Sequence, residues 1–183
     1  MIIRTFDNFL LFLEKDSKMY EYGCVMLYLT IPKWNEIISQ ISQKDLYQSE
    51  NDRYGVEIEP HVTILYGISP YVDDIEVKSL FENIKKTDFD LLFTEIDCFF
   101  NIDYDVLKIN VISTKLNELN ELLKDNLDHT TQYKEYIPHV TIGYLKKGTG
   151  GKYLDKNFTI KDFSVDKIVY SKSNGDVLNI TII

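Results

Sequence analysis

The tetrapeptide HVTI occurs twice and holds two of the three histidines in the chain, at residues 61–64 and again at 139–142, each time directly after a proline. Two histidines suit proton transfer at phosphorus, because a neutral ring can remove a proton from water or a hydroxyl while a protonated ring donates one to the leaving oxygen. Threonine hydroxyls can hold the non-bridging phosphate oxygens. The pattern therefore predicts general acid–base catalysis at a phosphodiester, without a metal or cofactor. The predicted catalytic residues are His61, Thr63, His139 and Thr141.

Each tetrapeptide lies in a segment typical of a β-strand, where side chains alternate between two faces. Alternation places the His and Thr of each copy on one face, with Leu65 in the first copy and Gly143 in the second. The Val and Ile side chains share the other face with Tyr66 and Tyr144, which we assign to the core. If the apolar faces are buried, the two His-Thr pairs face each other across a cleft, and Gly143 leaves that wall open.

The strands that carry the tetrapeptides belong to a longer internal repeat. A single His-x-Thr triplet fits a buried histidine on an ordinary strand, but two identical tetrapeptides in matching strand–helix–strand contexts favour a functional pair. Residues 105–111 also resemble 176–182. We therefore predict an α+β fold with two pseudo-symmetric lobes of antiparallel sheet, flanking helices and a central cleft between the paired HxTx strands. Residues 1–183 form one bilobal domain in this interpretation, with lobes at about 20–100 and 101–183 after an N-terminal helix at 1–19.

Periodicity and turn residues predict the remaining elements. Helices are expected after Pro32, after Asp73 and over 114–127. Strands are expected over 22–31, 61–67, 89–100, 105–112 and 137–145, followed by a final hairpin that turns at Asn174-Gly175.

The composition narrows the function further. Acidic residues outnumber basic ones by 29 to 20, for a net charge of -9, which disfavours binding to long DNA or RNA but allows a small nucleotide in a local pocket. Cys24 and Cys98 lie far apart and outside any metal-binding spacing, and the apolar stretch at 9–13 is too short to cross a membrane. We expect a cytoplasmic protein, monomeric and without a membrane partner.

The paired HxTx strands, the duplicated α+β halves and the length resemble the 2H phosphoesterase superfamily from about Tyr22 onward. That superfamily includes 2′-5′ RNA ligase-like proteins and cyclic nucleotide phosphodiesterases. The resemblance implies that His61 and His139 are the catalytic pair and that Thr63 and Thr141 bind phosphate. Residues 55–67 and 98–111 are most similar to small phage-encoded members, which degrade the cyclic oligonucleotide signals of bacterial anti-phage defence. The implied substrate is a cyclic di- or trinucleotide in the host cytoplasm, cleaved at a 3′-5′ linkage.

Aromatic residues near the expected cleft are candidates for stacking on a base: Phe99, Phe100 and Tyr28. Three alternatives stay open: an enzyme that opens 2′,3′-cyclic phosphates or processes 2′-5′ linkages on RNA ends, a binding protein that sequesters a cyclic nucleotide uncleaved, and an interaction protein. The sequence decides neither which histidine is the acid nor whether water or a 2′-hydroxyl attacks.

Overall fold

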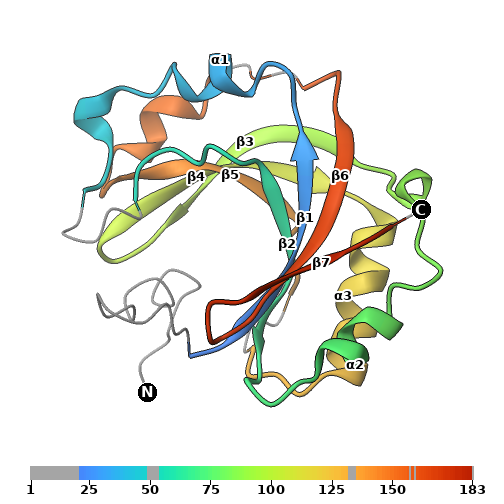
Figure 1. The fold of residues 1–183 in the computed structure, drawn as a ribbon. Coiled ribbons are helices and arrows are strands. Elements are labelled where there is room, and N and C mark those ends of the chain that lie inside the picture. The colour runs from blue at the N-terminus through green and yellow to red at the C-terminus, as the bar shows by residue number, and fades with distance from the viewer. Residues whose placement is uncertain (1–20, 49–53, 132–134, 157, 159, 183) are drawn as a thin grey trace.

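A computed structural model describes residues 21–48, 54–131, 135–156, 158 and 160–182 (Figure 1), so the helix predicted at 1–19 lies outside the described residues. The strands are β1 (Gly23–Thr30), β2 (His61–Ile68), β3 (Leu92–Phe100), β4 (Tyr104–Ile112), β5 (His139–Lys146), β6 (Ser164–Ser171) and β7 (Val177–Ile180). The helices are α1 (Trp34–Ile38), α2 (Asp74–Ser79) and α3 (Thr114–Asn126), with short 3₁₀ turns η2 (Gln43–Asp45), η3 (Lys86–Asp88) and η4 (Gly150–Tyr153).

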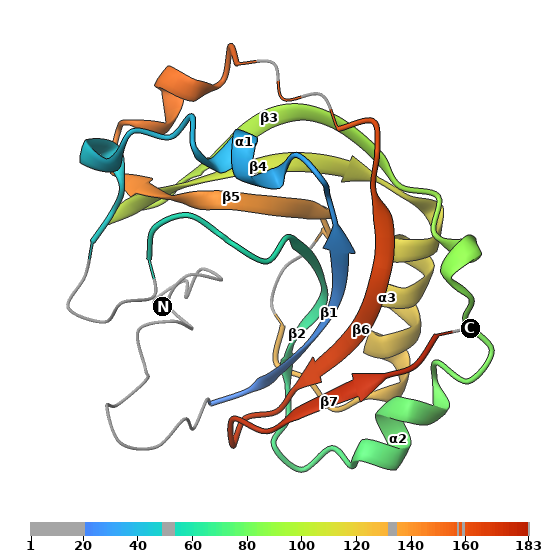
Figure 2. The same ribbon diagram turned by 45° about the horizontal axis from the view of Figure 1, so that its top comes forward.

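These seven strands form one antiparallel sheet in the order β3-β4-β5-β2-β1-β6-β7. The sheet bends sharply between β5 and β2, so that β3, β4 and β5 run across the direction of β2, β1 and β6 (Figure 2). The predicted α+β class and antiparallel sheet are confirmed. The final hairpin also turns where predicted, at Gly175, whose positive φ of 87° is the backbone conformation that glycine adopts readily.

The sheet is pseudo-symmetric about β2 and β5, the two strands that carry the tetrapeptides. In the strand order, β1 flanks β2 as β4 flanks β5, and β6 and β3 come next on either side. In chain order the repeated units are β1-β2-β3 and β4-β5-β6, which meet just after Phe100. The third strand of each unit nevertheless joins the other half of the sheet: β3 lies next to β4, and β6 lies next to β1. The two halves of the sheet therefore do not follow the predicted lobes. The expected equivalence of 105–111 and 176–182 is wrong, because β4 lies inside the sheet and β7 at its edge.

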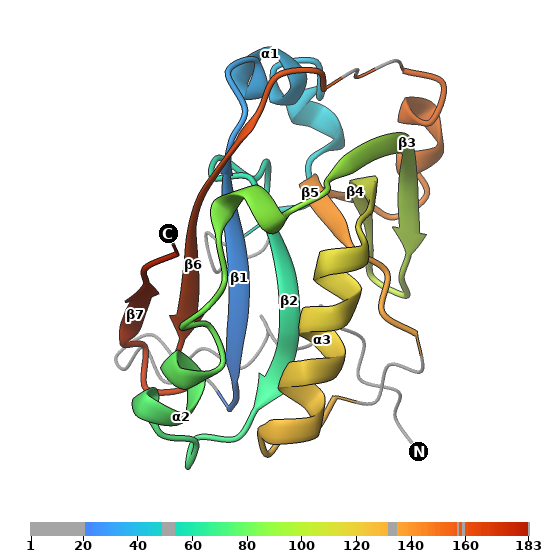
Figure 3. The ribbon, with the colours of Figure 1, turned by 90° about the vertical axis from the view of Figure 1, so that its right-hand side faces the viewer.

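Helix α3 follows the predicted pattern and is capped by side chains at its first turn. The Ser113 hydroxyl accepts a hydrogen bond from the Leu116 N–H (3.1 Å), and the Asp90 carboxylate accepts from the N–H groups of Thr114 and Lys115. Its buried face packs against β2 (Figure 3). Helix α3 thereby supports β2, one of the two strands that carry a tetrapeptide.

Helix α1, which was expected after Pro32, is short. Its α-helical part ends at Ile38, after which the N–H groups of Gln40 and Ile41 bond three residues back. This tighter turn still buries Ile41. The Trp34 indole N–H donates to the Glu57 carbonyl (2.7 Å), which fastens α1 to the segment that leads into β2.

Candidate active site

Strands β2 and β5 meet at a single register position, Val62 opposite Val140. Residues directly opposite each other in an antiparallel pair point to the same face, so both valines lie on one face and their neighbours on the other. Both valines are fully buried, whereas the flanking His and Thr side chains are partly exposed. One register pair therefore places His61, Thr63, His139 and Thr141 on one face of the sheet, here called the cleft face.

A bulge at the last residue of each tetrapeptide changes the predicted alternation. In β2, Thr63 lies opposite Met26 and Leu65 opposite Val25; in β5, Thr141 and Gly143 lie opposite Lys108 and Leu107. Two residues on the tetrapeptide strand therefore span one step of the neighbouring strand, and the extra residue is the Ile of each copy.

The predicted faces were therefore wrong for the residues beyond each bulge. Leu65 is buried in the core and does not join His61 on the cleft face. Tyr66 and Tyr144, placed on the Val/Ile face by simple alternation, return to the cleft face and line the cavity there. Tyr144 is nevertheless buried in a second apolar cluster with Tyr104 and Val106, so its assignment to the core is confirmed. Gly143 lies on the core face, where the Cβ of any other residue would come 2.8 Å from the Gly55 carbonyl oxygen. Gly143 thus admits a neighbouring backbone and does not open the wall of the cleft.

Both histidine rings are held in the same way. The Nδ1 of His61 is 2.9 Å from the carbonyl oxygen of Glu59, and the Nδ1 of His139 is 2.7 Å from that of Ile137. A carbonyl oxygen can only accept, so each Nδ1 carries a hydrogen and each Nε2 is left to accept or transfer a proton. Pro60 and Pro138 lie between these carbonyl groups and the two histidines. Their own carbonyl oxygens accept hydrogen bonds from N–H groups of the adjacent strands, β1 and β4 respectively.

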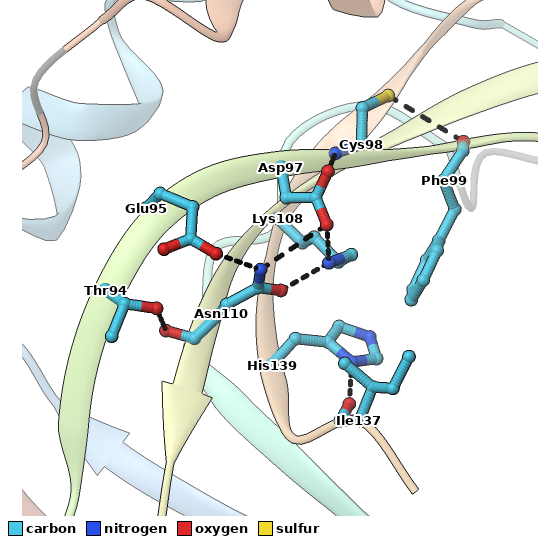
Figure 4. Close-up of polar contacts among 9 residues, drawn as sticks. All are labelled: Thr94, Glu95, Asp97, Cys98, Phe99, Lys108, Asn110, Ile137 and His139. Atoms are coloured by element: carbon cyan, nitrogen blue, oxygen red, sulfur yellow. Dashed lines mark hydrogen bonds and ion pairs between the residues drawn. The ribbon is translucent and has the colours of Figure 1, made fainter. Parts of the chain in front are cut away.

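On the β5 side, an ion pair between a buried lysine and a half-exposed aspartate lies beside His139 (Figure 4). Lys108 is opposite Thr141 and Asp97 is opposite Lys108, with Lys108 Nζ 2.7 Å from Asp97 Oδ2. Lys108 Nζ also donates to the Asn110 amide oxygen and lies 4.4 Å from the centre of the Phe99 ring. Although burial raises the pKa of Asp97, the hydrogen bond from Lys108 holds it below its ordinary value.

On the β2 side, the equivalent positions are apolar or aromatic. Met26 is opposite Thr63 where Lys108 is opposite Thr141, and Val169 occupies the place of Asp97. Tyr28 is opposite His61 with the ring centres 5.2 Å apart, and Lys167 Nζ lies 5.3 Å from the centre of the Tyr28 ring. The two histidines therefore share their backbone geometry but differ in electrostatic surroundings.

The surroundings of His139 disfavour its protonated form. Desolvation lowers the pKa of His139 to about 4, the Nδ1 contact with the Ile137 carbonyl opposes that shift, and the Lys108 ammonium adds to it. The ring also makes an edge-to-face contact with Phe99, at 5.1 Å between centres. His139 is accordingly neutral at physiological pH and suited to remove a proton.

A cavity of about 500 Å³ opens along the cleft face. Thr63, His139 and Thr141 line it, together with the predicted substrate-binding residues Phe99 and Phe100; Phe100 is 62% exposed. His61 and Tyr28 are not among its lining residues, and Tyr28 instead borders a smaller hollow of about 310 Å³. The structure thus brings Phe99 and Phe100 to the larger cavity and places Tyr28 beside the His61 ring outside it.

Several residues of the site were missed by the sequence analysis: Asp97, Lys108, Asn110, Asn120 and Tyr136. The available signal was a lone lysine inside an otherwise apolar strand, since Lys108 lies between Leu107 and Ile109. Asn120 and Tyr136 gave no such signal, because a helix and a loop bring them to β2.

Among the described residues, no group of three or more His, Cys, Asp or Glu side chains is placed to hold a metal ion. Within the same residues, no helix is long and apolar enough to cross a membrane.

The sequence model of a family described as the 2′-5′ RNA ligase superfamily matches residues 31–176, most of the 183-residue chain and both tetrapeptides. No curated protein matches the chain. Members of this superfamily are phosphoesterases, and the antiparallel α+β sheet agrees with the 2H phosphoesterase fold.

Proposed function

Since this chain belongs to the 2′-5′ RNA ligase superfamily, we propose that it is a metal-independent phosphodiesterase that hydrolyses a 3′-5′ linkage in a cyclic di- or trinucleotide. One observation carries the proposal. The single pairing of Val62 with Val140 sets both His-Thr pairs on one face, with each Nδ1 bonded to a carbonyl and each Nε2 available. A phosphodiester between the pairs meets two proton-transfer groups and two hydroxyl donors.

The asymmetry of the site suggests the role of each histidine. Neutral His139 removes a proton through Nε2 from the attacking water or ribose 2′-hydroxyl, and the attacking oxygen forms a bond to phosphorus. The bond from phosphorus to the leaving oxygen breaks, and that oxygen takes a proton from protonated His61. If the 2′-hydroxyl attacks, a 2′,3′-cyclic phosphate forms first, and water then opens it with the roles reversed. The Thr63 and Thr141 hydroxyls donate to the non-bridging oxygens throughout.

The cyclic nucleotide is favoured by charge and by cavity size. A net charge of -9 opposes a long polyanion, because such binding draws on many lysines and arginines. A cavity of about 500 Å³ lies in the range of small-molecule sites. The similarity of residues 55–67 and 98–111 to phage-encoded enzymes supports a role in removing a cyclic nucleotide signal of host antiviral defence. We expect weaker activity on long RNA than on a compact cyclic nucleotide.

The test is to incubate the protein with cyclic dinucleotides, cyclic trinucleotides, 2′,3′-cyclic mononucleotides and 2′-5′-linked RNA, with and without EDTA, and to separate the products. We expect His61→Ala and His139→Ala each to lower the rate about 100-fold or more. His129→Ala is the matched control, because this third histidine lies outside both tetrapeptides. Full activity in the double His61→Ala/His139→Ala variant would contradict the proposal, and recovery of unaltered ligand would identify a binding protein.

The family match favours a second candidate, an enzyme that opens 2′,3′-cyclic phosphates or processes 2′-5′ linkages on RNA ends. The same histidines would serve that reaction, and only the substrate differs. Turnover confined to the 2′,3′-cyclic mononucleotides or the 2′-5′-linked RNA in the same panel would select it.

A further inference from the structure

Beyond their single shared register position, β2 and β5 each have an edge that no longer faces the other strand. On β5 this edge is covered by main chain. The Glu57 N–H donates to the Ile142 carbonyl (2.9 Å), and the Tyr144 N–H donates to the Gly55 carbonyl (2.7 Å). Residues 55–57 thus act as a short extra strand, and Gly143 makes room for them.

The equivalent edge of β2 is covered differently. Ile64 is the counterpart of Ile142, but its carbonyl accepts from the side-chain amide of Asn120 on α3, at 2.6 Å from Nδ2. The neighbouring Thr63 carbonyl accepts from the Tyr136 hydroxyl at 2.9 Å. The amide of Asn120 therefore supplies the hydrogen bond that a backbone N–H supplies on the other side. Because side chains replace a strand here, the cavity extends between β2 and α3.

Asn120 is the polar side chain that this arrangement leaves incomplete. It is only 3% exposed, it lines the cavity, and its Oδ1 has no hydrogen-bond partner among the described residues. Its orientation is fixed, since the Ile64 carbonyl can only accept and so holds Nδ2. A buried acceptor without a partner is costly and rare in native proteins, so a donor from a ligand is the natural complement.

We propose that this part of the cavity is a base-recognition subsite in which Asn120 Oδ1 accepts an N–H from the nucleobase of the substrate. This proposal rests on the proposed function. Ile64 directly follows Thr63, so the base belongs to the nucleotide whose phosphate lies at the histidines. The rings of Phe99, Tyr66 and Tyr136 line the same cavity and offer stacking surfaces. The recognised class is a base with an N–H donor on its Watson–Crick edge.

The experiment measures binding of nucleoside 3′-monophosphates by calorimetry, because these ligands contain no phosphodiester to cleave. The tightest of the adenosine, guanosine, cytidine and uridine forms is compared with an analogue whose Watson–Crick N–H donors are removed or methylated; for adenosine the analogue is purine riboside 3′-monophosphate. Each pair is measured on wild type, Asn120→Leu and the control Asn117→Leu. Asn117 lies on the same helix and donates to the Ser113 carbonyl.

Wild type and Asn117→Leu should prefer the parent over the analogue about tenfold, the effect of one hydrogen bond to an otherwise unpaired buried acceptor. Asn120→Leu should bind the two about equally. The ratio within one variant is unaffected by any general loss of folded protein. Equal binding by wild type, retained preference in Asn120→Leu, or no binding of any nucleotide would overturn the subsite. Base preference without phosphodiester cleavage would contradict the proposed function alone, whereas cleavage without base preference would contradict the subsite alone.

Discussion

The ion pair between Lys108 and Asp97 gives a stability prediction in which the two partners behave unequally. The Lys108 side chain is 0% exposed, whereas that of Asp97 is 46% exposed. Replacing Asp97 with Asn leaves a buried ammonium without a countercharge. Replacing Lys108 with Met, the residue at the equivalent position on the β2 side, leaves a carboxylate that water and the Cys98 N–H still solvate.

The magnitudes follow from this difference in exposure. Removing one partner of a buried pair costs about 3–5 kcal/mol when the remaining charge is buried. Asp97→Asn should fall near the lower end, about 3 kcal/mol, because the Asn110 amide oxygen and the Phe99 ring still contact the ammonium. Lys108→Met should cost about 1 kcal/mol or less, since the half-exposed carboxylate returns to water and the thioether packs in the vacated space. The double variant should resemble Lys108→Met alone.

The assay is urea unfolding of the four proteins of this double-mutant cycle, with free energies extrapolated to zero denaturant. Glu118→Gln is the control, because its pair with Lys115 is exposed and long, at 3.8 Å, and should change stability by less than about 0.5 kcal/mol. The reasoning fails if Asp97→Asn costs no more than Lys108→Met. It also fails if the double variant is as unstable as Asp97→Asn.

Two further predictions concern the histidine pair and the covered edge of β5. The acid limb of the kcat/KM profile should fall near pH 4, because His139 acts as the base only when neutral and its pKa is about 4. Lys108→Met should move this limb to higher pH, since it removes a cation that disfavours protonation; an unmoved limb would assign the base elsewhere. Gly143→Ala should destabilise the protein by about 1–3 kcal/mol in thermal or urea unfolding, because the new Cβ meets the Gly55 carbonyl at 2.8 Å. Gly151→Ala, with nothing within 4 Å, should change stability by less than about 0.5 kcal/mol, and equal effects of the two would refute the clash.

The four His and Thr side chains of the candidate site could be predicted because their signal is local. Two identical tetrapeptides give the residue types, and a period of two places His and Thr on one face as long as the strand is regular. Val62 and Val140 confirm that alternation, since both are fully buried. The strands and the long helix α3 followed from apolar periodicity for the same reason.

The residues beyond the tetrapeptides could not be predicted because a bulge has no sequence signal of this kind. One extra residue at Ile64 and at Ile142 reverses the face of everything that follows, which moved Tyr66 and Tyr144 to the cleft. The third strand of each unit, β3 or β6, pairs with the first strand of the other unit, and a pairing between residues so far apart in the chain leaves no local pattern in the sequence.

The pseudo-symmetry explains why unequal surroundings of the two histidines matter in a duplicated site. Two histidines in identical surroundings would titrate together, and the state with one chosen ring neutral and the other protonated would reach at most about a quarter of the molecules. Lowering the pKa of only one ring raises that fraction, because at a pH between the two pKa values that ring is neutral while the other is protonated. The duplicated strands supply equal geometry, with each Nδ1 bonded to a carbonyl two residues earlier. Desolvation of the His139 ring lowers its pKa most; Lys108, in place of Met26, adds to that shift, and Asp97, in place of Val169, opposes it. The division of roles between His61 and His139 therefore depends on the neighbouring strands, where the two halves of the sheet differ, and not on the tetrapeptides, where they are the same.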